Sequence, residues 1–304
     1  MNLDSVNNVM KDCDICPRNC HADRLRGQKG FCHSGAEPAV ARVSLHYYEE
    51  PCISGDVGSG TVFFGGCNMA CVYCQNRQIS FAGGGKNITV ERLAEIFLEQ
   101  QKAGAANLNL VTPTHFTPQI IVALRLAKSK GFKLPVVWNS SGYEKVETLR
   151  LLKGLVDIYL VDFKYFNGEL AQMYSHAVDY PVVAKAALAE MFRQQPRVEF
   201  GQSGLMTRGC LVRHLLLPSY VDYSKQALKY LFEEYGHDIY ISIMGQYTPC
   251  GDLEQYPQIN RKLTRREYDD LVDFAVELGI ENAFVQELTA ADEAYIPEFD
   301  CRGV

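Results

Sequence analysis

Between residues 58 and 286 the sequence alternates short apolar or β-branched runs with longer amphipathic segments, and this alternation constrains the fold more than any other feature. Runs of this kind are typical of strands in a parallel sheet that is covered on both faces. We expect seven strands, at Gly60–Phe64, Asn107–Val111, Val136–Asn139, Asp157–Asp162, Cys210–Leu217, Asp238–Ile243 and Ala283–Gln286.

Helical patterns separate these runs. In Thr89–Ala103, Thr89 is the expected N-cap, and Leu93, Ile96, Phe97 and Gln100 share one face. Further helices are expected at Pro118–Lys130, Glu144–Leu152, Tyr180–Arg193, Asp222–Tyr235 and Thr264–Leu278, the last with Gly279 as its C-cap. Six or seven βα units predict an α/β fold, a partial (β/α)6 barrel of the TIM type, with its site at the C-terminal ends of the strands. An open doubly wound sheet is the alternative.

The 304 residues suit a single α/β barrel with additions at its ends. We assign residues 58–286 to the barrel, residues 1–57 to an N-terminal cysteine-rich metal-binding segment and residues 287–304 to a C-terminal tail. A net charge of −6 gives no reason to expect nucleic-acid or membrane-surface binding. No apolar run is long enough to span a bilayer, and the first residues lack the pattern of a signal peptide. A cytoplasmic protein is therefore expected.

Eleven cysteines, seven of them in two groups, point to metal ligation, because cytoplasmic thiols are kept reduced. One group reads Cys67-x3-Cys71-x2-Cys74 and follows the first expected strand directly. Three thiolates can hold three irons of a [4Fe–4S] cluster and leave the fourth iron without a protein ligand. The alternatives are a zinc site that borrows a histidine and a set of buried free thiols.

This loop, with Tyr73 before its last cysteine, resembles the signature of the radical S-adenosylmethionine superfamily. The resemblance implies that S-adenosylmethionine binds the open iron. It further implies that one electron through the cluster cleaves the cofactor to a 5′-deoxyadenosyl radical, which abstracts hydrogen from a substrate. Cys67, Cys71 and Cys74 would then be the catalytic residues, with Tyr73 beside the cofactor.

Other strand ends resemble the glycyl-radical-enzyme activating enzymes, of which the pyruvate formate-lyase activating enzyme is one. Asp162 and Lys164 form an Asp-x-Lys pair at the end of the fourth strand, and Arg213 lies in the fifth. Asn139 ends the third strand and Ser141 follows it, with Asn139 where those enzymes carry an acid. The resemblance implies that these five residues contact S-adenosylmethionine.

Two segments depart from the activating-enzyme pattern. After the second strand the chain reads VTPTHFTPQ, Val111–Gln119, in place of Gly-Gly-Glu-Pro, so Thr112, Thr114 and His115 would have to contact the cofactor. After the sixth strand, Gln246 occupies the position of a cavity histidine.

The N-terminal group is Cys13-x2-Cys16-x3-Cys20-x11-Cys32, and its spacing predicts a closed metal site. A structural four-thiolate zinc site and a second, auxiliary [4Fe–4S] cluster both fit this pattern. The aromatic and acidic stretch His46–Pro51 is interpreted as packing at the core edge in preference to a substrate wall.

These features favour a radical enzyme similar to the activating enzymes, which would form a glycyl radical on a partner protein and take electrons from a flavodoxin- or ferredoxin-type donor. The alternatives are a radical enzyme that modifies a small molecule or peptide, and a non-catalytic iron–sulfur or zinc regulatory protein. The sequence does not fix the substrate, the oligomeric state or whether S-adenosylmethionine is consumed.

Overall fold

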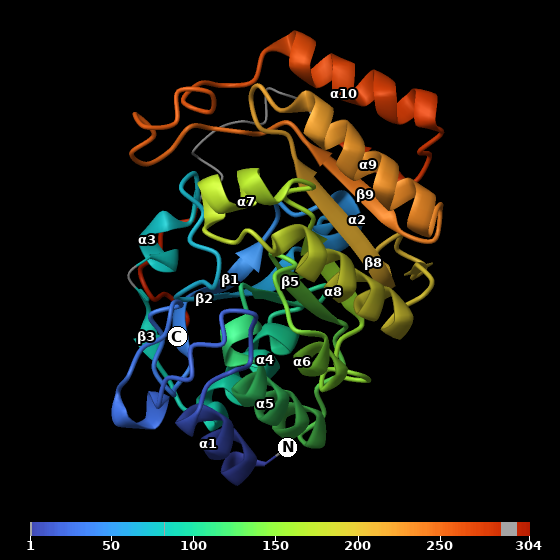
Figure 1. Ribbon diagram of the computed structural model, residues 1–304. Helices are drawn as coiled ribbons and strands as arrows, with labels where there is room; N and C mark the ends of the chain where they lie inside the picture. The colour runs from blue at the N-terminus through green and yellow to red at the C-terminus, as the bar shows by residue number, and fades with distance from the viewer. Residues whose placement is uncertain (1, 82, 287–296) are drawn as a thin grey trace.

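The computed structural model describes residues 2–81, 83–286 and 297–304 (Figure 1). The described chain forms an α/β fold around a ten-stranded sheet whose central strands run parallel. All the expected strands are confirmed to within a few residues at their ends. They are β2 (Ser59–Phe64), β4 (Leu108–Val111), β5 (Val136–Ser140), β6 (Ile158–Asp162), β8 (Met206–Leu215), β9 (Tyr240–Met244) and β10 (Ala283–Val285).

The order of the strands identifies the winding of the sheet. From one side to the other it reads β2, β4, β5, β6, β8, β9, β10, so each parallel strand lies beside the next one along the chain. A doubly wound sheet would reverse direction near its middle, whereas a barrel keeps this sequential order. The partial barrel is therefore confirmed, and the doubly wound alternative is wrong.

Three strands were not expected. β1 (Ala39–His46) pairs antiparallel with β2, with His46 opposite Ser59, and it also pairs with β3 (Lys86–Asn87). β7 (Glu199–Phe200) pairs antiparallel with β8. β1 lies within residues 1–57, so the main sheet begins inside the range that we assigned to the N-terminal segment.

The expected helices are all present, and their ends carry the expected caps. The Thr89 side chain accepts a hydrogen bond from the Arg92 backbone, and Gly279 adopts a left-handed conformation (φ 87°) after the last helix. These helices are α4 (Val90–Lys102), α5 (Thr117–Ser129), α6 (Val146–Arg150), α8 (Tyr180–Gln194), α9 (Val221–Tyr235) and α10 (Arg265–Leu278). Four were not expected: α1 (Leu3–Lys11), α2 (Pro51–Ser54), α3 (Arg77–Ser80) and α7 (Gly168–Ser175).

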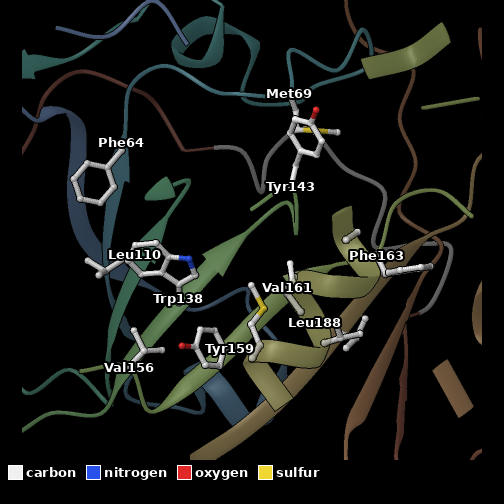
Figure 2. Packing of buried hydrophobic residues seen from close by; sticks show 14 of the residues in the cluster. Phe64, Met69, Leu110, Trp138, Tyr143, Val156, Tyr159, Val161, Phe163 and Leu188 are labelled. Carbon is white, nitrogen blue, oxygen red and sulfur yellow. The ribbon is translucent and has the colours of Figure 1, made fainter. Parts of the chain in front are cut away.

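The main core lies between the outer face of the sheet and the helices α4 to α10. Phe64, Leu110, Trp138 and Tyr159 come from four successive strands and are fully or almost fully buried in it (Figure 2). Successive side chains of a strand point to opposite faces. On each of these strands, the residues next to the buried ones therefore face the inside of the barrel.

The inner face changes character along the strands. Val137, Ile158 and Leu211 are buried there against Cys52 and Ile53 of α2. Closer to the C-terminal ends of the same strands, this face carries polar residues: Asn139 in β5, Asp162 in β6 and Arg213 in β8. The barrel is therefore apolar at one end and polar toward the C-terminal ends of its strands.

Residues 301 and 302 lie beside β1, at the opposite side of the sheet from β10. Cys301 N donates to Ala41 O (2.9 Å) and Val43 N donates to Arg302 O (2.8 Å), which adds backbone pairing to the edge of β1. Of the tail, residues 287–296 lie outside the described residues. Within the described ranges, no helix is both long enough and apolar enough to cross a membrane.

Candidate active site

The three-cysteine loop leaves the C-terminal end of β2, at the polar end of the barrel. Cys71 is buried, and Cys67 and Cys74 are half-buried. Burial, together with the neighbouring Cys71, raises the pKa of Cys67 to about 11 and that of Cys74 to about 12. Thiolates at these positions would therefore need a strong positive charge beside them, which metal coordination supplies.

Each of the three sulfurs accepts a hydrogen bond. The donors are the Met69 backbone to Cys67 (3.4 Å), Ser175 Oγ to Cys71 (3.0 Å) and Ser80 Oγ to Cys74 (3.4 Å). Such bonds stabilise sulfur ligands and tune the potential of an iron–sulfur cluster. The three sulfurs also need not converge on one point, because each cysteine of a [4Fe–4S] cluster binds a different iron. The loop fits such a cluster.

A chain of hydroxyl groups leads to Cys71. The hydroxyls of Tyr73 and Tyr165 are 2.7 Å apart, and Tyr165 lies 2.7 Å from Ser175 Oγ. Because Ser175 donates to the sulfur, Tyr165 must donate to Ser175 and Tyr73 to Tyr165. The Tyr73 side chain is thus part of the support of Cys71.

Asp162 and Lys164 lie beside this loop. Lys164 Nζ is 2.7 Å from Asp162 Oδ2, and both side chains remain partly exposed, at 17% and 26%. Burial alone would lower the pKa of Lys164, but Asp162 and Cys71 raise it well above its usual range. Lys164 is therefore an ammonium group near the cysteines, where it can attract a carboxylate.

Arg213 is held by two acidic residues that the sequence did not point to. Its Nε and Nη2 bind Glu50 in a bidentate pair (2.8 and 2.6 Å), and Nη2 also contacts Glu49. Burial opposes the charge of Glu50, but Arg213 lowers the pKa of this carboxyl below its usual value. The acidic pair of the His46–Pro51 stretch thus lies inside the barrel, which corrects its interpretation as packing at the core edge.

The segment after β4 lies against the cysteine loop. His115 is buried and its Nε2 donates to Gly65 O (2.8 Å), while burial and the charge of Arg24 lower its pKa to about 3. Thr114 Oγ1 donates to the buried Glu144 (3.1 Å), and Thr112 is half-buried with a positive φ of 57°. His115 therefore supports the loop as a neutral side chain.

The remaining predicted contacts lie at other strand ends. Asn139, in β5, points its amide toward Glu49 (3.4 Å). Ser141 follows β5, and its carbonyl accepts a hydrogen bond from Tyr180 (2.8 Å). Gln246 lies just beyond β9 and is half-buried. Together with Asp162, Lys164 and Arg213, these residues occupy the C-terminal parts of four neighbouring strands or the residues just after them.

The four N-terminal cysteines form one group. Cys13, Cys16 and Cys32 are buried and Cys20 is exposed. Burial raises the pKa of Cys16 to about 12, and the nearby Cys32, Cys13 and Cys20 add to this effect. Across residues 2–81, 83–286 and 297–304, however, no group of three or more His, Cys, Asp or Glu residues, in this segment or in the three-cysteine loop, is arranged around a single metal ion. The predicted second metal site stays a prediction.

The segment that carries these cysteines packs directly against the three-cysteine loop and against the segment after β4. Arg18 Nε donates to Asn68 O (2.8 Å), and Arg24 Nη1 donates to His115 O (2.7 Å). At Gly66 a side-chain Cβ would collide with the Cys32 carbonyl, so glycine is required for this close approach. The two cysteine groups are thus neighbours in space.

Part of the chain is similar to a known protein family. The sequence profile of the Radical SAM superfamily matches residues 61–191, which contain the three-cysteine loop, Asp162 and Lys164. This match supports the radical SAM superfamily for the part of the chain that it covers.

Two curated proteins of Methanocaldococcus jannaschii are similar to the chain. "Uncharacterized protein MJ0674" is 29% identical over 290 residues, which cover 92% of this chain and 79% of that protein. "Putative glycyl-radical enzyme activating enzyme MJ1227" is 32% identical over 108 residues, 35% of this chain and 43% of that protein. Among solved structures, Streptococcus suis SuiB bound to S-adenosylmethionine has a TM-score of 0.49 at 13% identity, covering 74% of this chain and 49% of that chain. The chain thus spans about half the length of SuiB.

Proposed function

We propose that the protein is a radical S-adenosylmethionine enzyme whose Cys67, Cys71 and Cys74 bind a [4Fe–4S] cluster. The observation that carries the proposal is a loop of three hydrogen-bonded cysteine sulfurs at the end of β2, beside the ammonium group of Lys164. When bound, the cluster supplies the one electron that cleaves S-adenosylmethionine, which makes a hydrogen-abstracting 5′-deoxyadenosyl radical available.

The residues of the chain would divide the remaining work. Ser175, Ser80 and the Met69 backbone would donate to the cluster sulfurs and stabilise their negative charge. Lys164 would pair with the carboxylate of the methionine part of the cofactor, and Asp162 would hold Lys164 and accept from the cofactor amine. The buried aromatic residues around the loop would keep water away from a reactive radical.

For the substrate, we propose a glycine residue of a partner protein, with a flavodoxin- or ferredoxin-type electron donor. The similarity to a protein named as a glycyl-radical enzyme activating enzyme supports this proposal over 35% of the chain. A small molecule or a peptide is the second candidate, because the segments after β4 and β9 depart from the activating-enzyme pattern.

We also propose a second metal centre at Cys13, Cys16, Cys20 and Cys32. Its support is the folding of the segment, in which His21 N donates to Cys13 O (2.9 Å) and Phe31 N donates to Cys20 Sγ (3.3 Å), and the position of Cys32 against the three-cysteine loop. An iron–sulfur cluster would pass electrons toward the site, whereas zinc would only hold the segment together.

The test compares Cys71→Ala with Cys210→Ala, both reconstituted anaerobically with iron and sulfide. Cys210 is a buried thiol of β8 whose sulfur contacts Gln195 O (3.7 Å) and not the three-cysteine loop, so it is a matched control. We expect the Cys71 variant to lose the cofactor-ligating cluster, measured as iron content and visible absorption, and the Cys210 variant to keep it. Full cluster content in the Cys71 variant would refute the proposed ligand.

A further inference from the structure

The side chain of Glu49 lies inside the barrel, between β4, β5 and β8. Its Oε1 accepts hydrogen bonds from Asn109 Nδ2 (2.8 Å) and Asn139 Nδ2 (3.4 Å), and its Oε2 contacts Arg213. The side chain is 8% exposed. Glu49 comes from the turn between β1 and α2, and none of the motifs that define the proposed cysteine site includes it.

The charges around Glu49 do not cancel. Arg213 already forms a bidentate pair with Glu50, and Lys164 is paired with Asp162. Glu49 also pairs with Arg213, so among the described residues of this cluster three carboxylates share two cations and leave one negative charge in excess. A buried carboxylate that must share its counter-charge with a second carboxylate is incompletely neutralised, so this position favours a further cation.

A second observation, independent of the charge, indicates where this cation would sit. Asn109 is fully buried, and its Oδ1 has no hydrogen-bond partner among the described residues. Its Nδ2 donates to Glu49, so the free carbonyl oxygen belongs to the same amide group and lies close to the carboxylate. Two neighbouring acceptors, one of them charged, suit a ligand that carries several N–H donors.

We infer that Glu49 and the Asn109 carbonyl form a subsite for a guanidinium or ammonium group of the substrate. The inference rests on the proposed function, because it assumes that a substrate enters this barrel interior. It narrows the substrate to molecules with a basic group, such as an arginine or lysine side chain or a primary amine.

The Asn109 end of the subsite lies deeper in the barrel than Asp162 and Lys164, the residues proposed to contact the cofactor. Asn109 pairs with Val137, two residues before Asn139, so it lies further from the C-terminal ends of the strands than Asn139. Asp162 remains 26% exposed, which shows that solvent reaches the polar end of the barrel. A basic group would enter past Asp162 and meet Glu49 below it.

Binding of n-butylguanidinium to the full-length protein tests the subsite, with n-butylurea as the uncharged probe of the same shape. Isothermal titration is done without reductant, so the result does not depend on radical chemistry. Glu49→Gln keeps the shape and the hydrogen bonds to Asn109 but removes the charge. Glu91→Gln, on the exposed first turn of α4, is the matched control.

We expect the wild-type protein and the Glu91 variant to bind n-butylguanidinium more tightly than n-butylurea. In the Glu49 variant the guanidinium affinity should fall roughly 30-fold or more, because one partner of a desolvated charge pair is lost. The affinity for S-adenosylhomocysteine should not change. Equal binding of the two probes by wild-type protein, or an unchanged guanidinium affinity in the Glu49 variant, would overturn the inference.

A joint loss of guanidinium and S-adenosylhomocysteine binding in the Glu49 variant would also overturn it, because Glu49 would then belong to the cofactor site or to the fold. The proposed function fails separately, if the Cys71 variant keeps its full cluster. The two failures are therefore distinguishable.

Discussion

Replacement of Arg213 by methionine would leave two carboxylates inside the barrel without their shared cation. Glu50 is 1% exposed and receives two hydrogen bonds from Arg213, at 2.8 and 2.6 Å. Arg213 itself is 12% exposed, so solvent screens this cluster little. Breaking a buried ion pair from one side costs about 3–5 kcal/mol, and we expect a loss of this size in the free energy of unfolding.

The assay is urea denaturation of the wild-type protein, Arg213→Met, Glu50→Gln and the double variant. The double variant should recover part of the lost free energy of unfolding, with a coupling energy of about 2 kcal/mol. The reason is that Glu50→Gln removes the carboxylate charge that Arg213→Met leaves unpaired. The control is Arg266→Met, an exposed position on α10, which should stay within about 0.5 kcal/mol of wild type.

The pH dependence gives an independent check. The folded protein holds the pKa of Glu50 below its unfolded value, so this group stabilises the fold above the unfolded pKa, and the contribution is lost as the pH falls through the folded pKa. Without Arg213, burial alone would raise that pKa. The difference between wild type and Arg213→Met should thus be large at pH 7 and smaller near pH 4. Additive effects of the two single changes, or a loss of unfolding free energy below about 1 kcal/mol at pH 7, would show that Arg213 and Glu50 do not form a stabilising buried ion pair.

Three further predictions concern the site. Asp162→Asn should weaken S-adenosylmethionine binding about 10-fold or more, because Lys164 loses its carboxylate partner, and an unchanged affinity in equilibrium binding would remove Asp162 from the site. Ser175→Ala should keep the cluster but lower its reduction potential, since a hydrogen bond to the Cys71 sulfur is lost; an unchanged midpoint in a redox titration followed by EPR would contradict this. Cys16→Ser should lose a metal centre, which metal analysis of anaerobically purified protein would identify as iron or zinc, and an unchanged metal content would contradict the second site.

The sequence predicted the parallel strands and the helices between them because each is specified locally. Strands that are buried on both faces are continuous apolar runs, and the caps at Thr89 and Gly279 follow from the local backbone. The polar residues at the strand ends were predictable for the same reason, since Asp162 and Lys164 follow an apolar run directly. β1 was missed because it lies within residues 1–57, whose sequence shows little strand periodicity. It pairs antiparallel with β2, outside the βα alternation.

The acidic pair was not predictable, because its partner is distant in sequence. Glu49 and Arg213 are 164 residues apart, and only closure of the barrel brings them together. Ser175 was missed because it ends α7, a short helix without strong periodicity. The signal that could have been used is the charge of Glu49 and Glu50 next to Pro51, since two acids before a buried turn need a cation.

Single-turnover chemistry of the wild-type protein is the most direct test of the radical reaction that we propose. The protein is reconstituted anaerobically, its cluster is reduced with dithionite, and labelled S-adenosylmethionine is added. We predict that labelled 5′-deoxyadenosine and methionine form in equal amounts. Protein that carries its full cluster and binds S-adenosylmethionine, yet forms no 5′-deoxyadenosine, would contradict the account.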